Sequence, residues 1–229
     1  MPLGLAKSVY QGFSAVAAGR DAVTSTVYGD AQVDTAQYKF GSSSMLLDGV
    51  DDGIITDDAL ELSNGEWTME CWARFSSFAS VAPVVFDPRV SGGSLARIIG
   101  LRLVSGNYRI GYWLGTWYPG STNLSTNTWT HLAWVYDGSD VKAYVDGTLD
   151  LTKSDTGTFV DGRVAFGALK DMVNYEIAGH FDEIRISRIA RYTSNFTPST
   201  SAFTNDSDTC LLLHCEGSDG STTFDDDNS

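Results

Sequence analysis

The chain has 229 residues, 42% hydrophobic and 12% aromatic, enough to bury one large core, and its 23 glycines favour strands and tight turns over helices. Its formal net charge of −14 would be repelled by phosphate backbones and by anionic membranes, which excludes nucleic acid as a partner and leaves cations, neutral glycans and basic protein surfaces. No run reaches the roughly 18 apolar residues that cross a membrane, so we expect no membrane insertion, and we find no signal peptide near the start.

Residues 1–28 are small and weakly patterned, and we interpret them as an N-terminal arm that precedes a single domain of residues 29–229. From about residue 40 onward, strand-like runs recur about every ten residues and close on Gly or Asp-Gly, which is typical of an antiparallel sandwich. The clearest alternation lies in residues 66–75, EWTMECWARF. It predicts one buried face made of Trp67, Met69, Cys71, Ala73 and Phe75.

Later segments follow the same logic. Residues 96–115 predict two strands joined by a turn at Ser-Gly-Asn, residues 105–107. The one short helical turn that the spacing allows begins at Ile186. Residues 209–215 hold the densest apolar run, so we expect a strand covered on both faces, paired either with this chain's own sheet or with a neighbouring subunit. The acidic end at residues 225–227 is interpreted as solvated.

Three cysteines are too few for a disulfide framework. Cys210 and Cys215 lie five residues apart on a predicted strand, hence on opposite faces, and should not bridge each other. Cys71 alternates with apolar residues and is expected in the core. We therefore expect reduced thiols, with a bridge from Cys71 to one of the other two as the open alternative.

Three stretches, taken in order, carry a resemblance: residues 39–75, 127–151 and 178–203. They hold a strand ending in LLDG, the alternating strand with its tryptophans, then WTHLA, YVDG and FDEIRI. This ordered set resembles the laminin-G-like, or concanavalin-A-like, jelly-roll family. The resemblance implies an all-β fold, a two-sheet antiparallel jelly-roll sandwich. It also implies a glycan-binding or adhesive module, with bound calcium in some members and glycoside hydrolase activity in others.

Residues 191–229, which contain LLLH, resemble in particular the version found in bacteriophage virion proteins. In those proteins this segment commonly links one such domain to a following one. Here its usual continuation resembles residues 28–41, at the front of the chain. The resemblance therefore leaves two arrangements open for the last strand: return to its own sandwich, or donation to a neighbour.

Asp182 is the first candidate site residue, because a period of two places its carboxylate on the face of Ile184 and Ile186. One interpretation is that it accepts backbone N–H bonds and fixes a loop at the rim of the sandwich. The other is that Asp182, with Asp48 from an Asp-rich turn, binds calcium, the only cofactor that we consider here.

The residues give no support for catalysis. Laminarinase-type enzymes on this fold carry Glu-x-Asp-x-x-Glu, which sets paired carboxylates on one strand face, and no such stretch occurs. The spacing from Glu176 to Asp182 differs, and alternation sends Asp182 and Glu183 to opposite faces. The histidines follow no triad pattern, and His131 is interpreted as structural. We therefore expect no catalytic residues and no enzyme activity.

A second candidate site lies in residues 108–123, where aromatic side chains crowd a stretch rich in glycine. Aromatic rings stack on the apolar faces of sugars, so Trp117 and Tyr118, with Trp113, are the candidate glycan-binding residues. The alternative is that these rings fill the core.

The sequence thus predicts a non-enzymatic bacteriophage virion protein, either a capsid-decoration or a tail-associated component, that displays a lectin-like jelly roll. Its expected location is the virion, assembled in the bacterial host cytoplasm. Its expected partners are other virion proteins, further copies of itself in a homo-oligomer, and a cell-surface glycan, with the arm and the last strand as anchors. The alternatives are a carbohydrate-binding adhesin for host-surface glycans and, third, a glycoside hydrolase.

Overall fold

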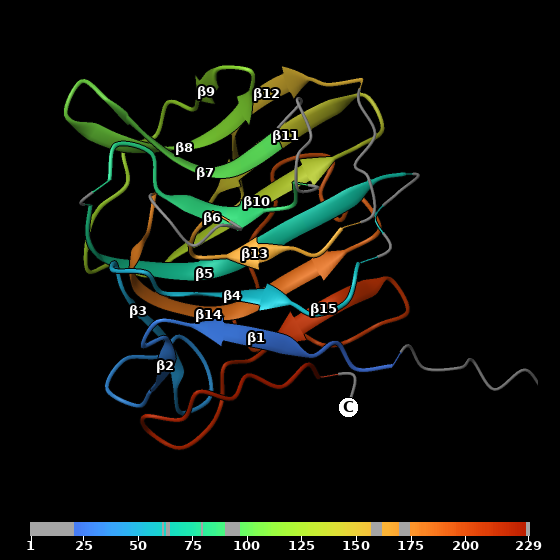
Figure 1. The fold of residues 1–229 in the computed structure, drawn as a ribbon. Coiled ribbons are helices and arrows are strands. Elements are labelled where there is room, and N and C mark those ends of the chain that lie inside the picture. The colour runs from blue at the N-terminus through green and yellow to red at the C-terminus, as the bar shows by residue number, and fades with distance from the viewer. Residues whose placement is uncertain are drawn as a thin grey trace, which may run out of the picture.

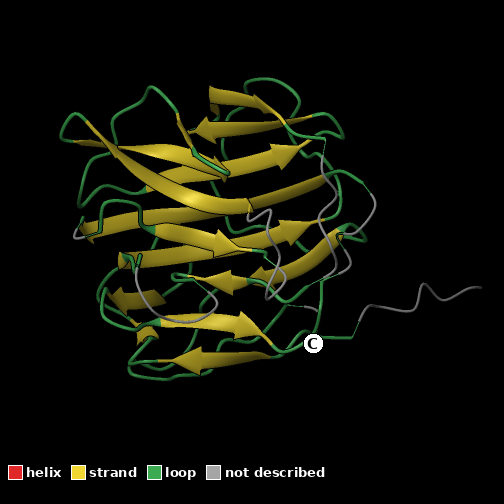
Figure 2. Cartoon of the chain, turned by 45° about the horizontal axis from the view of Figure 1, so that its top comes forward, coloured by secondary structure: helices red, strands yellow, loops and turns green. Residues whose placement is uncertain are grey.

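The protein is a β-sandwich of two antiparallel sheets, seen in a computed structural model (Figure 1). The structure describes residues 21–60, 62, 65–78, 80–89, 97–156, 162–169 and 175–227. Within these ranges the chain forms strands and loops without a helix (Figure 2), and so contains no helix that could cross a membrane. The all-β, two-sheet prediction is confirmed, whereas the short helical turn predicted from Ile186 is wrong.

One sheet has seven strands, in the order β1-β4-β13-β6-β7-β8-β9. Their bounds are Ser25–Tyr28 (β1), Gly53–Thr56 (β4), Ala165–Phe166 (β13), Val84–Asp87 (β6), Arg97–Val104 (β7), Asn107–Leu114 (β8) and Trp117–Pro119 (β9). The strands β1 and β9 are therefore the two opposite edges of this sheet.

The second sheet has eight strands, in the order β12-β11-β10-β5-β14-β3-β2, and β15 also pairs with β14. Their bounds are Thr148–Ser154 (β12), Asp140–Val145 (β11), Thr130–Tyr136 (β10), Trp67–Ser77 (β5), Ala178–Ser187 (β14), Ser44–Asp48 (β3), Gln32–Asp34 (β2) and Thr209–Leu213 (β15). The two sheets enclose the main core between their inner faces.

Alternation along β5 decides which side chains enter that core. The five residues predicted for its buried face all belong to the main core, and their side chains are fully buried. Glu70 and Trp72, between them, point to the outer face of the eight-stranded sheet, where Trp72 packs in a separate small cluster with Phe203 and Leu212. The period of two is therefore confirmed along this strand.

The hairpin predicted in residues 96–115 is formed by β7 and β8. Val104 pairs with Asn107, so the turn consists of Ser105 and Gly106 alone. Both have positive φ, 49° and 83°, as a type I′ turn requires.

A β-bulge in β14 changes the face to which Asp182 points. Asp182 pairs with Trp72 and Arg185 pairs with Glu70, so three steps along β14 match two steps along β5. Glu183, within the bulge, has a φ of 52°. Ile184 belongs to the main core, whereas Asp182 lies on the outer face with Trp72. The sequence-based placement of Asp182 beside Ile184 and Ile186 is therefore wrong.

The last strand returns to its own sandwich. β15 pairs antiparallel with the second half of β14, on the side where β3 pairs with the first half. All five residues of β15 are buried, as the apolar run predicts. Of the two arrangements left open for the last strand, the structure shows the one in which it pairs within its own chain.

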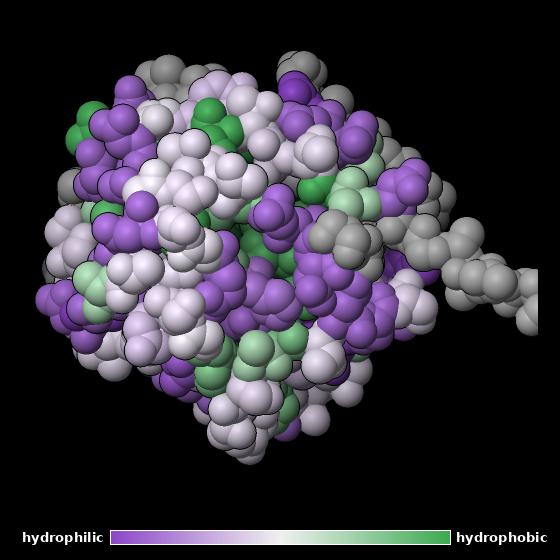
Figure 3. All heavy atoms as spheres, turned by 90° about the horizontal axis from the view of Figure 1, so that it is seen from below, coloured by the Kyte–Doolittle hydropathy of each residue, from purple (hydrophilic) through white to green (hydrophobic). Residues whose placement is uncertain are grey.

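The two ends of the described chain meet. The carboxylate of Asp226 accepts a hydrogen bond from the Val23 N–H (2.9 Å) and another from the Leu212 N–H (3.0 Å), and it is only 2% exposed. The acidic end is therefore not simply solvated. Figure 3 shows the face that carries these ends as mostly hydrophilic, with hydrophobic atoms at the bottom of a hollow.

The predicted arm overlaps the sandwich. Residues 25–28 form β1, and each of them pairs with a residue of β4. The sandwich thus begins before residue 29, and residues 1–20 of the arm lie outside the described residues.

Candidate functional site

Trp113 and Trp117 lie together on the outer face of the seven-stranded sheet. They are directly paired across β8 and β9, so their side chains share one face. Tyr112, which alternates with Trp113, is fully buried in the main core, so the tryptophan face is the outer one. The two indole rings are 5.8 Å apart at an interplanar angle of 67°, and both residues are half-buried.

Gly111 makes room for Trp117. A Cβ atom at this position would lie 3.1 Å from Trp117 Cε3, tighter than ordinary van der Waals contact. The absence of a side chain therefore lets the indole of Trp117 lie against the backbone of β8.

Tyr118 faces the other way. It pairs with Tyr112, whose side chain lies in the core, and its ring is covered by the Lys153 ammonium, 4.4 Å from the ring centroid. Lys153 belongs to β12, at the edge of the opposite sheet. Of the three predicted glycan-binding residues, the structure brings Trp113 and Trp117 together and separates Tyr118 from them.

Polar residues that the sequence reasoning missed continue the tryptophan face. Arg102 of β7 pairs with Arg109 of β8, and Arg109 alternates with Gly111 and Trp113 on the same face. Arg109 Nε donates to Asn123 Oδ1 at 2.9 Å. The period of two applied to residues 109, 111 and 113 would have found Arg109, but not its partner across the hairpin.

Asp48 and Asp182 are not brought together. Asp48 lies opposite Ala178 in β14, four residues from Asp182, which corresponds to about 13 Å along the strand. Asp182 Oδ2 accepts hydrogen bonds from the N–H groups of Lys39 (2.8 Å) and Phe40 (3.0 Å), so its carboxylate holds a loop, as one interpretation predicts. Among the described residues, no group of three or more histidine, cysteine or acidic side chains could hold a metal ion.

The Asp182 carboxylate is an unusual group even without a metal. It is fully buried, and its Oδ1 has no hydrogen-bond partner among the described residues. Burial, together with the neighbouring charge of Glu183, raises the pKa of Asp182 to about 7, although the two backbone N–H donors lower it. Glu183 lies at the same covered face, where it accepts hydrogen bonds from the Phe203 N–H and from His214. The bulge therefore overturns the expected separation of these two carboxylates.

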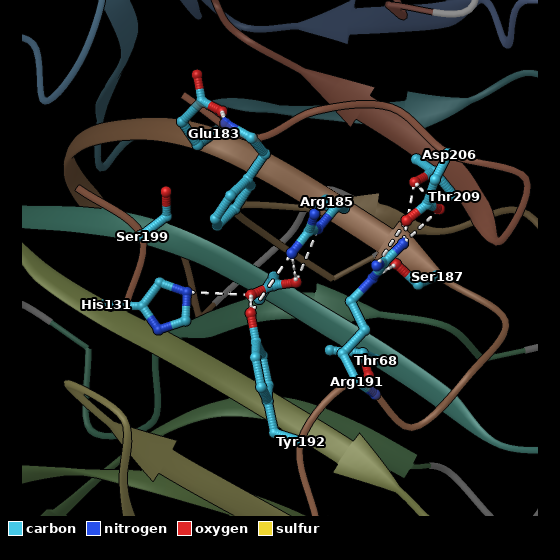
Figure 4. Close-up of polar contacts among 12 residues, drawn as sticks. Thr68, His131, Glu183, Arg185, Ser187, Arg191, Tyr192, Ser199, Asp206 and Thr209 are labelled. Atoms are coloured by element: carbon cyan, nitrogen blue, oxygen red, sulfur yellow. Dashed lines mark hydrogen bonds and ion pairs between the residues drawn. The ribbon is translucent and has the colours of Figure 1, made fainter. Parts of the chain in front are cut away.

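A network of buried charged side chains lies on the outer face of the eight-stranded sheet (Figure 4). Glu70 receives hydrogen bonds from Arg185 (2.8 Å) and Tyr192 (2.8 Å), and its other contact is with His131 Nε2 at 3.1 Å. Burial alone would raise the pKa of Glu70, but the hydrogen bond with His131 and the charge of Arg185 hold it below its ordinary value. The Arg185 guanidinium also lies 4.0 Å from the ring centroid of Phe203.

This network belongs to a segment that we call the strap, residues 188–208 between β14 and β15. Tyr192 and Phe196 of the strap stack on each other (3.5 Å) and pack on Tyr144, while Thr68 of β5 donates to the Ile189 carbonyl (2.8 Å). The strap thus covers the sheet above Glu70. Because His131 and Glu70 are 0% exposed, this network stabilises the fold and offers no surface to a ligand.

The histidines and cysteines have structural surroundings. His131 contacts the carboxylate of Glu70 and His180 that of Asp34, whereas His214 contacts two carboxylates, of Glu183 and Asp227. The structural interpretation of His131 is confirmed. All three cysteines are buried thiols without a disulfide, which confirms the expected reduced state.

The profile of one protein family, described as the concanavalin A-like lectin/glucanases superfamily, matches residues 48–194, well over half of the chain. The chain belongs to this superfamily. A comparison with curated proteins found no match to this sequence.

Several solved structures have a fold similar to that of this chain. Domain 4 of an extracellular arabinanase from Geobacillus stearothermophilus, in complex with arabinotriose, is 20% identical (TM-score 0.55; 71% of this chain, 81% of that chain). A cellulose-induced protein is 16% identical (TM-score 0.52; 72% and 86%). A heptameric SAP-like pentraxin from Limulus polyphemus is 14% identical (TM-score 0.52; 81% and 90%). The family match confirms the predicted jelly-roll family, while its bacteriophage version stays a prediction.

Proposed function

We propose that the protein is a non-catalytic carbohydrate-binding module whose sugar-binding surface is built around Trp113 and Trp117. The observation that carries the proposal is the direct pairing of these two half-buried tryptophans on the outer face of β8 and β9. Indole rings offer large apolar faces that suit the C–H faces of sugar rings, and their N–H groups can bind hydroxyls. The lectin-like fold supports this assignment.

The surroundings of the acidic residues support a binding function over hydrolysis. A glycosidase needs two carboxylates flanking the scissile bond, accessible to the substrate. The carboxylates that the bulge of β14 brings together, Asp182 and Glu183, are buried and engaged with backbone N–H groups and His214. Glu70 is likewise enclosed by its three partners.

Glycan-array screening of the purified chain, followed by calorimetric titration with any glycan that binds, tests the proposal. Trp117→Ala and Trp113→Ala should each weaken binding at least about tenfold, because a buried aromatic contact is worth more than 1 kcal/mol. Tyr28→Ala, an exposed aromatic residue on the opposite edge strand β1, is the matched control and should bind like wild type. Full binding by both tryptophan variants would remove this surface from consideration.

Hydrolysis is tested separately. We expect no release of reducing sugar from any glycan that the chain binds. Release that persists in an Asp182→Asn and Glu183→Gln double variant would place an active site elsewhere and contradict a non-catalytic function.

A second, compatible function is display of this module on a bacteriophage particle, as a capsid-decoration or tail-associated component located in the virion. The observation that favours it is where the two ends of the described residues lie: Val23, just before β1, contacts Asp226, and β1 is the sheet edge opposite β9 (Figure 1). Six strand spacings separate these edges, about 29 Å along the sheet. Attachment near the ends to virion proteins, or to further copies of the chain, would leave the tryptophans exposed.

Electron microscopy of the assembled particle, with an antibody raised against residues 113–123, tests the display function. Labelling on the particle surface, blocked by the free peptide, is the expected result. Particles that lack the chain altogether would exclude the virion location without affecting the carbohydrate-binding proposal.

A further inference from the structure

The tryptophan face continues along the β7–β8 hairpin as three successive pairs of residues. Ile98 pairs with Trp113, Gly100 with Gly111, and Arg102 with Arg109. Residues two apart on a strand share a face and lie about 7 Å apart. The outer face of the hairpin therefore carries an apolar pair, then a pair of glycines, and then a pair of arginines.

The pair of arginines has unusual surroundings. Two like charges directly opposite each other in a sheet destabilise it. Among the described residues, Arg102 makes no hydrogen bond or ion pair, and Arg109 has Asn123 as its one partner (2.9 Å). By contrast, Arg97 at the start of the same strand points inward and is paired with the buried Asp155.

Trp117 connects the three residue pairs into one surface. Its ring carbons lie over Gly111, and the position of a Cβ on that glycine would also be 3.5 Å from Arg102 Cβ. The indole therefore reaches from Trp113 toward the arginine pair. A ligand stacked on Trp117 would have its neighbouring substituents within reach of one or both guanidinium groups.

We propose that this surface binds an acidic glycan, with a sugar ring on Trp117 and a carboxylate or sulfate group between Arg102 and Arg109. The inference rests on the proposed carbohydrate binding and specifies its ligand class. Guanidinium groups bind carboxylate and sulfate oxygens through paired N–H donors. The hydrogen bond to Asn123 orients the fork of Arg109, and the donors of Arg102 have no partner among the described residues.

Because the protein is strongly acidic overall, binding of an anionic ligand depends on the arginine pair. With a net charge of −14 the protein as a whole repels an anionic ligand, so binding must come from contacts at the pair and not from long-range attraction. Asp150, an acidic residue that the loop after β9 contacts, accepts hydrogen bonds from Ser121 and Thr122. It is therefore already occupied by hydroxyl and backbone donors.

The experiment compares acidic ligands with neutral counterparts in which the anionic group is esterified or removed. Calorimetry would measure binding of tetragalacturonate and of its methyl ester, and of a sulfated galactan tetrasaccharide and its desulfated form. We expect each acidic form to bind at least about tenfold more tightly than its neutral counterpart. Raising the salt from about 0.05 M to about 0.5 M should reduce this preference. Preference for only one of the two acids would identify which anion the pair accepts.

Variants separate this inference from the proposed function. An Arg102→Gln and Arg109→Gln double variant should bind both forms of a ligand equally, while Trp117→Ala should weaken both forms by the same factor. Arg188→Gln, which removes one positive charge from an arginine elsewhere whose side chain is 50% exposed, is the control and should keep the preference. Thermal unfolding of each variant checks that it is folded.

The outcomes are distinguishable. Equal binding of acidic and neutral forms by the wild type, with loss of both in Trp117→Ala, would overturn the acidic-glycan inference and leave carbohydrate binding intact. A preference for the acid that survives the double arginine substitution would overturn it as well. No binding of any glycan, acidic or neutral, would overturn the proposed function itself.

Discussion

Glu70 and Arg185 face each other across β5 and β14, and their charged groups meet 2.7 Å apart beneath the strap. Neither could remain charged at this depth without the other, since burying an unpaired charge is strongly unfavourable. Tyr192 of the strap completes the pair by donating to the same carboxylate. The strap is therefore held over the sheet by electrostatics as well as by its aromatic side chains.

Glu70→Gln should destabilise the protein by about 3–5 kcal/mol, because it leaves the Arg185 guanidinium buried without its counter-charge. Chemical denaturation measures the loss, and limited proteolysis should cut first within the strap. A Glu70→Gln, Arg185→Met double variant should recover part of the stability. The exposed pair Arg188–Asp208, at 3.7 Å, provides the control: Asp208→Asn should change stability by less than about 0.5 kcal/mol.

Asp182 should make stability depend on pH. Its pKa is raised from 3.8 to about 7 in the folded protein, so the folded state binds the extra proton and the free energy of unfolding falls as pH rises from about 4 to about 7. Asp182→Asn keeps the shape and an acceptor for the Lys39 N–H without the charge. It should equal wild type near pH 3 and be more stable near pH 8, by about 4 kcal/mol at most.

The comparison of Asp182→Asn with wild type at each pH removes the other titrating groups. His214, whose pKa is raised by its hydrogen bond to Glu183, also loses its stabilising contribution as pH rises, but it is present in both proteins. A difference in unfolding free energy that stays constant from pH 5 to pH 8 would contradict the raised pKa of Asp182.

Gly111→Ala tests whether the position of Trp117 matters for binding. The added methyl group would meet the indole at 3.1 Å and displace it by a few tenths of an ångström. Glycan affinity should fall severalfold, while stability changes by less than about 1 kcal/mol because the half-buried ring can move outward. Gly65→Ala, where nothing lies within 4 Å, should change neither quantity. Titration and thermal unfolding of both variants measure the two effects.

Asp226→Ala should lower stability by about 2 kcal/mol, since the buried N–H groups of Val23 and Leu212 would each lose an acceptor. The neighbouring Asp225 is exposed, and Asp225→Ala is expected to leave stability unchanged. Equal effects of the two substitutions on the urea midpoint would mean that the acidic end does not tie the chain ends together.

The thiols should be unreactive in the native protein. Burial raises the pKa of Cys71 and of Cys215 well above its usual value, and all three cysteines are buried. A thiol-specific reagent should label them only after unfolding, and a reducing agent should not shift the melting temperature. Rapid labelling of a native cysteine, or a lower melting temperature on reduction, would disagree with this structure.

Much of the fold was readable from local patterns. The alternation in β5 named five core residues, the apolar run of β15 indicated a strand covered on both faces, and the Ser105-Gly106 turn located a hairpin. These predictions succeed because side-chain direction along a strand and the sign of φ in a two-residue turn depend on neighbouring residues alone.

The candidate sites needed the tertiary structure. The sequence named Trp113, Trp117 and Tyr118 together, but only the pairing of β8 with β9 puts the first two on one face and Tyr118 on the other. The pairing of Arg102 with Arg109 likewise depends on the register of the hairpin. Which face of a strand is outer follows from the sheet packed against it, and a single strand does not specify that.

Asp182 shows where local sequence patterns are insufficient and the tertiary structure decides. Its role in holding a loop was one of the two interpretations of the sequence, yet the bulge at Glu183 reverses the face that a strict period of two assigns. The strap and the contact of Asp226 with Val23, 203 residues apart, arise in the same way. The sequence by itself determined an all-β sandwich and its core. Registers, bulges and the pairing of distant segments, which depend on the whole chain closing at once, decided what each face carries.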